Sequence, residues 1–286
     1  MSGVRTRATA GTVAQGTGKL AIFLVQCAIG LSFLYPLYFM IINSLKSRPG
    51  YYTNPFALPR APLQFVNFSA MVSQFKILLL FRSTFVICLA TLALLILLGI
   101  LASYAFSKLR FRWSQPVYLG IVVTLFIPAQ VTMIPMYVLF ARAGLVNTYW
   151  GVVLAYLAQF IPEVVMLMTA NFRSIPNEII EASEIDGCSY WQVVRNVILP
   201  TGRAAVFLTV IFYFIVMWND LFIPMVLLQK MDMRTVMVAL AGLIARYTGD
   251  PPYQFAGLLL SAVPALLVYV VFQQYIIKGL TAGAIK

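Results

Sequence analysis

Long apolar stretches alternate with shorter polar ones along the chain. Each apolar stretch has more than 20 residues, which is enough for a helix to cross about 30 Å of hydrocarbon. Because a backbone in hydrocarbon must satisfy its own hydrogen bonds, we predict that each stretch forms one transmembrane helix. The six predicted spans comprise residues 20–42, 83–106, 116–140, 150–172, 204–228 and 255–277.

Composition supports this interpretation. Of the 286 residues, 62% are hydrophobic and only 10% are charged, whereas soluble domains carry about 25% charged residues. We therefore predict an all-α, polytopic membrane protein with six transmembrane helices. Residues 1–18 are small, polar and weakly basic, so they are expected to form a disordered cytoplasmic tail. Residues 19–286 then form the transmembrane domain.

The polar stretch 177–200 lies between the fourth and fifth spans. Glu178, Glu181 and Glu184 recur at three-residue spacing and are predicted to share one face of a short helix. The isoleucines of this helix are expected to face a membrane surface or a partner: Ile179, Ile180 and Ile185. The alternative for such a stretch is a solvated, negatively charged cytoplasmic loop of some other membrane protein.

Turn signals divide the same stretch into two helices. Gly187 tolerates the positive φ that often ends a helix. Ser189 and Gln192 have the spacing of a capping box and predict the start of a second helix. Pro200 is expected to stop that helix after Leu199.

The stretch resembles the loop signature of ABC-importer permease subunits. That signature reads Glu-Ala-Ala, three residues, Gly, nine residues, then Ile-x-Leu-Pro. The corresponding positions here are Glu181, Ala182, Ser183, Gly187, Val197, Leu199 and Pro200. Ser183 replaces the second alanine and Val197 replaces the isoleucine. In the family this loop is cytoplasmic and docks into a cleft on a separate ATPase subunit, which implies a cytoplasmic coupling loop over residues 174–200.

Further tracts are similar to carbohydrate-uptake permeases of the MalG type, from about residue 20 to the carboxyl end. They are residues 103–106, 144–151, 218–220 with Pro224, and 278–286. The resemblance implies an ABC type I importer permease-like fold. It also implies three kinds of partner: a second related permease, two ATPase subunits and an extracytoplasmic sugar-binding protein. Membrane lipid is a further partner, which the apolar and basic composition predicts.

The resemblance also bears on cofactors and chemistry. It implies a prokaryotic cytoplasmic membrane protein that is not an enzyme and carries no cofactor, because ATP and Mg bind the partner ATPase. The sequence contains no histidine, which excludes serine–histidine and cysteine–histidine proteases and zinc enzymes of the HExxH type. Its three cysteines, Cys27, Cys88 and Cys188, show no metal-binding spacing.

Charge predicts the orientation in the membrane. The net charge of +12 is typical of a chain among lipid headgroups and gives no basic domain for nucleic acid. Lys108, Arg110 and Arg112 follow the second span within six residues. Cytoplasmic loops are rich in such residues, so both termini and the 174–200 loop are predicted to be cytoplasmic.

The resemblance assigns roles within the loop. Glu181 is expected to pair with a basic residue of the ATPase, Ala182 to permit close approach, and Gly187 to form the bend. Leu199 and Pro200 are expected to fix the angle into the fifth span. The full set of predicted coupling residues is Glu178, Glu181, Ala182, Ser183, Asp186, Gly187, Leu199 and Pro200.

Two carboxylates lie within predicted spans, where a charge costs roughly 2.5–3.5 kcal/mol and is expected to face the bundle interior or water. Glu163, with Gln159 nearby, either lines the sugar pathway or pairs with a neighbouring helix or with the partner permease. Asp220, with Asn219, is assigned to the pathway set but is expected to have a structural role. A rival hypothesis is an ion-coupled secondary transporter that uses Glu163 and Asp220.

Overall fold

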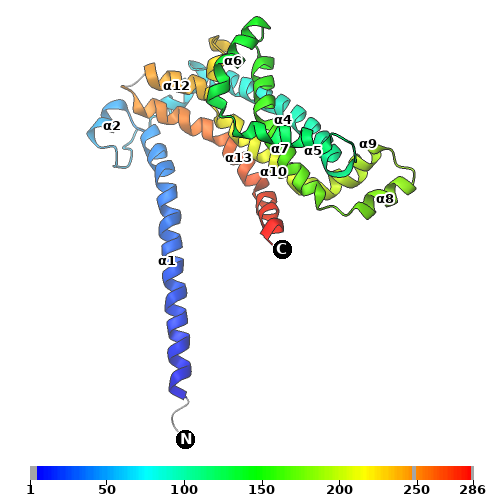
Figure 1. Cartoon of the computed structure of the whole chain (residues 1–286). Helices are drawn as coiled ribbons and strands as arrows, with labels where there is room; N and C mark the ends of the chain where they lie inside the picture. The colour runs from blue at the N-terminus through cyan, green and yellow to red at the C-terminus, as the bar shows by residue number, and fades with distance from the viewer. Residues whose placement is uncertain (1–4, 247–248, 285–286) are drawn as a thin grey trace. The chain divides into compact units, whose positions relative to one another are not determined.

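The computed structural model describes the backbone of residues 5–246 and 249–284, and the side chains of residues 19, 22–245 and 249–274. These residues form helices and irregular segments without a strand, which confirms the all-α prediction (Figure 1). The helices are α1 (Arg5–Ser44), α2 (Arg48–Thr53), α3 (Val66–Ser73), α4 (Ile77–Lys108), α5 (Ser114–Val123), η1 (Thr124–Phe126), α6 (Ala129–Arg142), α7 (Tyr149–Arg173), α8 (Asn177–Ile185), α9 (Tyr190–Val193), η2 (Val194–Ile198), α10 (Leu199–Asn219), α11 (Phe222–Leu227), η3 (Met231–Met233), α12 (Val236–Arg246) and α13 (Pro251–Ala284).

Within the part of the chain that the structure describes, five helical segments are long and apolar enough to cross a bilayer, and a bent pair makes a sixth if it counts as one span. The five are Ile22–Ser44, Ile77–Lys108, Tyr149–Arg173, Tyr190–Asn219 and Pro251–Gln274. The third predicted span, 116–140, is the bent pair: α5 with η1 turns into α6 by 103°. Pro128 causes the break, because it forces Ile127 into an extended conformation, with φ −87° and ψ 113°.

Two sequence predictions need correction at the ends of elements. Residues 5–18, expected to be disordered, continue the backbone of α1. Adding residues to an existing helix costs far less than nucleating one, and residues 5–18 contain no proline to stop it. The fifth span, predicted over 204–228, ends at Asn219, and α11 follows as a separate helix after Asp220 and Leu221.

The chain divides into two units, and the first comprises Met1–Met71 with Tyr247–Leu259. Within it, the side chain of Lys46 is buried and donates hydrogen bonds to Asn43 Oδ1 at 2.9 Å and to the carbonyls of Asn54 and Pro55 at 3.1 and 2.9 Å. Burial lowers the pKa of the Lys46 ammonium from its ordinary value. Asn67 adds a bond to the Ser44 carbonyl at 2.8 Å, so this polar segment has a defined fold.

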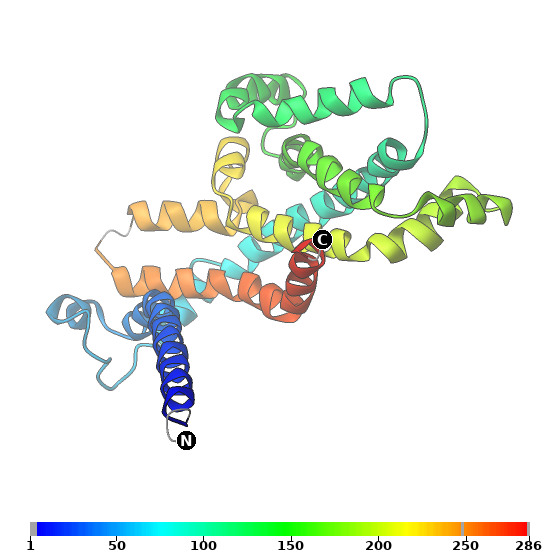
Figure 2. The ribbon, with the colours of Figure 1, turned by 60° about the horizontal axis from the view of Figure 1, so that its bottom comes forward.

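The second unit comprises Val72–Arg246 with Leu260–Lys286, and its core lies where α4, α7 and α10 pack together. Two glycines permit the close approach. A Cβ atom at Gly99 would lie 2.6 Å from Val164 Cγ1, and one at Gly202 would lie 2.6 Å from Phe172 Cε1. Both views show α8 and α9 beyond one end of these three helices (Figures 1 and 2). The packing therefore presents the 177–200 segment at the end of a rigid bundle.

Candidate functional site

The segment between α7 and α10 consists of two short helices with a bend at Gly187, as the sequence predicts. Gly187 has φ +80° and follows the end of α8. The Gly187 N–H donates to the Glu184 carbonyl and the Cys188 N–H to the Ser183 carbonyl, both at 3.0 Å. This pair of bonds is a Schellman motif, which closes a helix end through a residue with positive φ. The bend is therefore fixed by local hydrogen bonds.

The capping box at the start of α9 is also confirmed. Gln192 Oε1 accepts hydrogen bonds from the Ser189 N–H at 2.7 Å and from the Ser189 hydroxyl at 2.9 Å. The first of these bonds satisfies a backbone donor at the helix start, and the second holds the two side chains together. The segment thus turns within three residues, 186–188, and begins a new helix without loose backbone.

One face of α8 packs on the bundle and the other is exposed. Ile180 and Ser183 are buried, and the Ser183 hydroxyl donates to the Ile180 carbonyl at 2.8 Å. The expectation that Ile180 faces a membrane surface or a partner is therefore wrong, because its side chain is buried within the chain. The exposed residues are Glu178, Ile179, Glu181, Ala182, Glu184, Ile185, Asp186 and Gly187.

Lys108 joins α8 to the end of α4, a role that the sequence did not reveal. Its ammonium donates hydrogen bonds to the Ile175 carbonyl and to Asn177 Oδ1, the latter at 2.9 Å. Glu178 interacts with it electrostatically. Sequence reasoning used Lys108 only for orientation, because its partners lie 67 and 69 residues away. The contact fixes the first turn of α8 to the bundle.

The exit from the segment differs from the prediction at Pro200. The chain does not stop after Leu199 but continues from α9 through the π-helical segment η2 into α10. Leu199 N–H donates to the Val194 carbonyl, five residues back. The added residue places Pro200 in the first turn of α10, where its missing N–H costs little. Leu199 and Pro200 therefore lie in a continuous helical connection.

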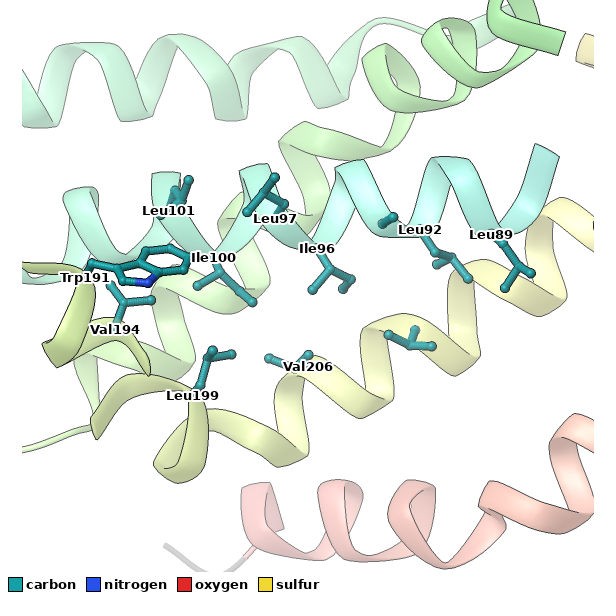
Figure 3. Close-up of a pocket in the computed structure, with 12 residues that line it drawn as sticks. Leu89, Leu92, Ile96, Leu97, Ile100, Leu101, Trp191, Val194, Leu199 and Val206 are labelled. Carbon is teal, nitrogen blue, oxygen red and sulfur yellow. The ribbon is translucent and has the colours of Figure 1, made fainter. Parts of the chain in front are cut away.

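An apolar groove lies beside this connection. It has a volume of about 520 Å³ and runs between α4 and the α9–α10 segment. Figure 3 shows Leu97, Ile100 and Leu101 on one side and Trp191, Val194 and Leu199 on the other. Every side chain that lines it is apolar or, in Trp191, mostly so. Sugar recognition requires hydrogen-bonding groups, so this groove lacks the chemistry of a sugar site.

Asp220 is engaged by the protein itself. It lies at the break between α10 and α11, where Asp220 Oδ2 accepts from the Tyr156 hydroxyl at 2.9 Å and from the Ile223 N–H at 3.2 Å. Asp220 Oδ1 accepts from the Phe222 N–H at 3.0 Å. This arrangement caps α11 and ties it to α7. The geometry agrees with the structural role expected of Asp220.

The other pathway candidates differ in their exposure. Gln159 and Asn219 are exposed, although the Asn219 amide also donates to the Ile215 carbonyl at 2.8 Å. Glu163 is half-buried on α7 and interacts electrostatically with the Tyr213 hydroxyl. Glu163 lies about 10 Å along α7 from Tyr156, the partner of Asp220. The two carboxylates are thus held by different neighbours.

The described residues contain no cluster of three or more metal-ligating His, Cys, Asp or Glu side chains. The cysteines have separate environments in this part of the chain. Cys27 is exposed, Cys88 is buried, and Cys188 follows the bend at Gly187.

Comparison with known proteins identifies a family that includes the 177–200 segment. Residues 95–281, which include the whole 177–200 segment, match the family described as binding-protein-dependent transport system inner membrane component. The diacetylchitobiose uptake system permease protein NgcG of Streptomyces coelicolor is 28% identical over 255 residues, covering 88% of this chain and 84% of that protein. The melibiose/raffinose/stachyose import permease protein MelC of Bacillus subtilis is 27% identical over 266 residues, covering 93% and 96%.

A solved structure shares the fold. One chain in the crystal structure of a bacterial ABC transporter involved in the import of the acidic polysaccharide alginate matches with a TM-score of 0.80. The sequence identity is 21%, and the match covers 92% of this chain and 97% of that chain. This similarity confirms the predicted ABC type I importer permease-like fold.

Proposed function

Because the chain belongs to the family of binding-protein-dependent transport system inner membrane components, we propose that it forms half of the translocation pathway of an ATP-driven sugar importer. A second related permease supplies the other half, and an extracytoplasmic sugar-binding protein delivers the substrate. The sugar class is supported by similarity to NgcG and MelC, whose names specify diacetylchitobiose and melibiose, raffinose and stachyose. ATP and Mg bind to two separate ATPase subunits, which hydrolyse the ATP.

The observation that carries this proposal is that α8 exposes an acidic face while its first residue is bonded to the end of α4. Glu178, Glu181 and Glu184 are exposed, while Ile180 and Lys108 hold the same helix to the bundle. An ATPase that grips this face moves α8, and the continuous η2–α10 connection carries the movement into the membrane. Glu181 pairs with a basic residue of the ATPase, and Ala182 permits its close approach.

The test substitutes Glu181→Arg and Gly187→Val in the assembled transporter. We expect both variants to insert and assemble, yet sugar uptake falls at least tenfold because ATP hydrolysis no longer drives it. Matched controls are Asp232→Arg, an exposed acid elsewhere, and Gly144→Val, a glycine with φ +67° and open space around it. Normal uptake by Glu181→Arg would contradict the coupling role.

The same proposal places Glu163 and Gln159 on the sugar pathway, where a carboxylate accepts hydroxyl hydrogen bonds. Glu163→Ala is expected to raise the sugar concentration for half-maximal uptake while leaving assembly intact. Glu163→Gln, which keeps an acceptor oxygen, is expected to lose less. An unchanged apparent sugar affinity in Glu163→Ala would remove Glu163 from the pathway. The ion-coupled alternative gains no support from Asp220, whose oxygens accept three hydrogen bonds within the chain.

The orientation belongs to the proposal as well, with both termini and the 174–200 loop on the cytoplasmic side of a prokaryotic cytoplasmic membrane. A Ser189→Cys substitution in a background without the three native cysteines tests it. A membrane-impermeant maleimide is expected to label this cysteine only in inside-out vesicles. Labelling in intact cells would reverse the orientation.

A further inference from the structure

The turn between α4 and α5 carries arginine side chains that have no part in the proposed coupling role. Arg110 and Arg112 are exposed, and neither makes an ion pair with any residue that the structure describes. Arg112 stacks on Trp113 at 5.7 Å, and nearby Arg173 stacks on Tyr118 of α5 at 5.1 Å. Three guanidinium groups around one short turn therefore lack anionic partners in this part of the chain.

The turn also encloses space. A shallow hollow of about 530 Å³, open to the outside, is lined by four polar residues, Arg110, Arg112, Ser114 and Gln115, and by the apolar Leu109 and Phe111. Guanidinium groups, a hydroxyl and an amide are the donors that recognise phosphate oxygens. The positive end of the α5 dipole favours an anion at the same place. The hollow is thus suited to a phosphate group.

The surroundings of the hollow indicate which phosphate it takes. Phe111 and Trp113 are exposed at the turn, with 44% and 62% of their surfaces accessible, as is typical of aromatic residues at a membrane–water interface. A second hollow, of about 460 Å³ and apolar, lies between α4, α5 and α7 beside Ala102 and Ile121. Ile121 is about 10 Å along α5 from Ser114. A phospholipid fits this arrangement, because its headgroup would lie in the polar hollow at the turn and an acyl chain would lie in the apolar hollow along α5.

We propose that the α4–α5 turn is a binding site for an anionic phospholipid of the inner leaflet, with Arg110 and Arg112 holding its phosphate. The leaflet assignment rests on the orientation under the proposed function. The site is separate from the acidic face of α8. It lies close in sequence to Lys108, which fixes α8 to α4, so a bound headgroup adds negative charge beside the base of the coupling helix.

The test measures lipid retention by the purified, fully assembled transporter with native mass spectrometry. Phosphatidylglycerol and phosphatidylcholine with identical acyl chains are the probes. We expect the wild type to retain phosphatidylglycerol preferentially and Arg110→Gln/Arg112→Gln to lose that preference roughly 30-fold, since each cation near a lipid surface contributes about a factor of five. The matched control, Arg60→Gln/Arg142→Gln, removes two other exposed arginines and is expected to retain the preference.

Further arms separate the possible sources of the anion. Stabilisation of the wild type, but not of the double variant, by inorganic phosphate alone would identify a free-phosphate site and overturn the lipid assignment. Loss of the ATPase subunits from the double variant with unchanged lipid retention would identify a protein contact and also overturn it. Ala102→Trp, which fills the apolar hollow, is expected to lower retention of both lipids. Lipid retention requires no transport, so its failure is distinct from failure of the coupling role.

Discussion

Asp220 lies just before the short helix α11 and Glu181 lies within the short helix α8, and the two carboxylates have different neighbours. The Asp220 oxygens accept from the Tyr156 hydroxyl and from two N–H groups of α11. Glu181 is exposed on α8, and none of the hydrogen bonds found among the described residues involves its carboxylate. The first carboxylate stabilises the fold, whereas the second remains available to another molecule. Similar residue types thus serve opposite purposes, and hydrogen-bond partners distinguish them.

The largest effect on stability is expected at Asp220. Asp220→Ala leaves the buried Tyr156 hydroxyl without its acceptor and removes the cap of α11, so we expect a loss of about 3 kcal/mol. Asp220→Asn keeps one acceptor oxygen and should lose less. Resistance of the purified protein to denaturation by SDS measures both. Wild-type stability in Asp220→Ala would show that its bonds contribute little and would break the comparison.

Lys108→Met should have the next largest effect. It removes two hydrogen bonds of a charged donor, one part-buried and one exposed, so we expect about 1–2 kcal/mol of lost local stability at the start of α8. Hydrogen–deuterium exchange over residues 175–186 should speed up while exchange in the core of α7 stays slow. Arg142→Met, another cation at a helix end, serves as the control. Unchanged exchange in Lys108→Met would show that Ile180 alone holds α8.

Ser189→Ala tests the bend itself. Loss of an N-cap hydroxyl typically costs about 1 kcal/mol, and the Ser189 N–H can still donate to Gln192. We therefore expect faster hydrogen exchange in α9 with little change in α8. Equal acceleration in both helices would mean that the Schellman motif at Gly187 does not isolate α8 from its neighbour.

Glu181→Gln should have the smallest effect on stability, below about 0.5 kcal/mol, because the side chain is exposed. If Glu181 pairs with a cation of the ATPase, uptake should nevertheless fall severalfold, and raised salt should reduce the difference from wild type. Glu184→Gln on the same helix is the comparison. A large destabilisation by Glu181→Gln would place this residue with Asp220 and remove the distinction between the two segments.

Local signals in the sequence were sufficient for the bend. Gly187, Ser189 and Gln192 specify their conformations through partners within five residues, so Gly187 predicted the bend and the Ser189–Gln192 spacing predicted the capping box. The six apolar stretches likewise predicted the helical class, because segment length and apolar composition decide it.

Contacts between distant residues were not predictable in this way. Lys108 meets the start of α8 across 67 residues, and Tyr156 meets Asp220 across 64. The apolar pattern continues from α10 into α11, so it does not indicate the end of the span at Asn219. That end depends on the hydrogen bonds of Asp220. Pro200 misled the prediction because the π-helical turn of η2 shifted the backbone register by one residue. Burial of Ile180 likewise depends on where α8 lies against the bundle.

The two glycine contacts of the second unit limit how α7 can move. Val164 and Phe172 of α7 fill the space that a side chain would occupy at Gly99 on α4 and at Gly202 on α10. Sliding any of these helices along its axis would drive a neighbouring backbone into a β-branched or aromatic group. Shear is therefore costly here, and a force applied to α8 is expected to tilt α4, α7 and α10 together as a lever. The ends of α4, α7 and α10 that lie farthest from α8 are then expected to move the most, because a tilt displaces a point in proportion to its distance from the pivot.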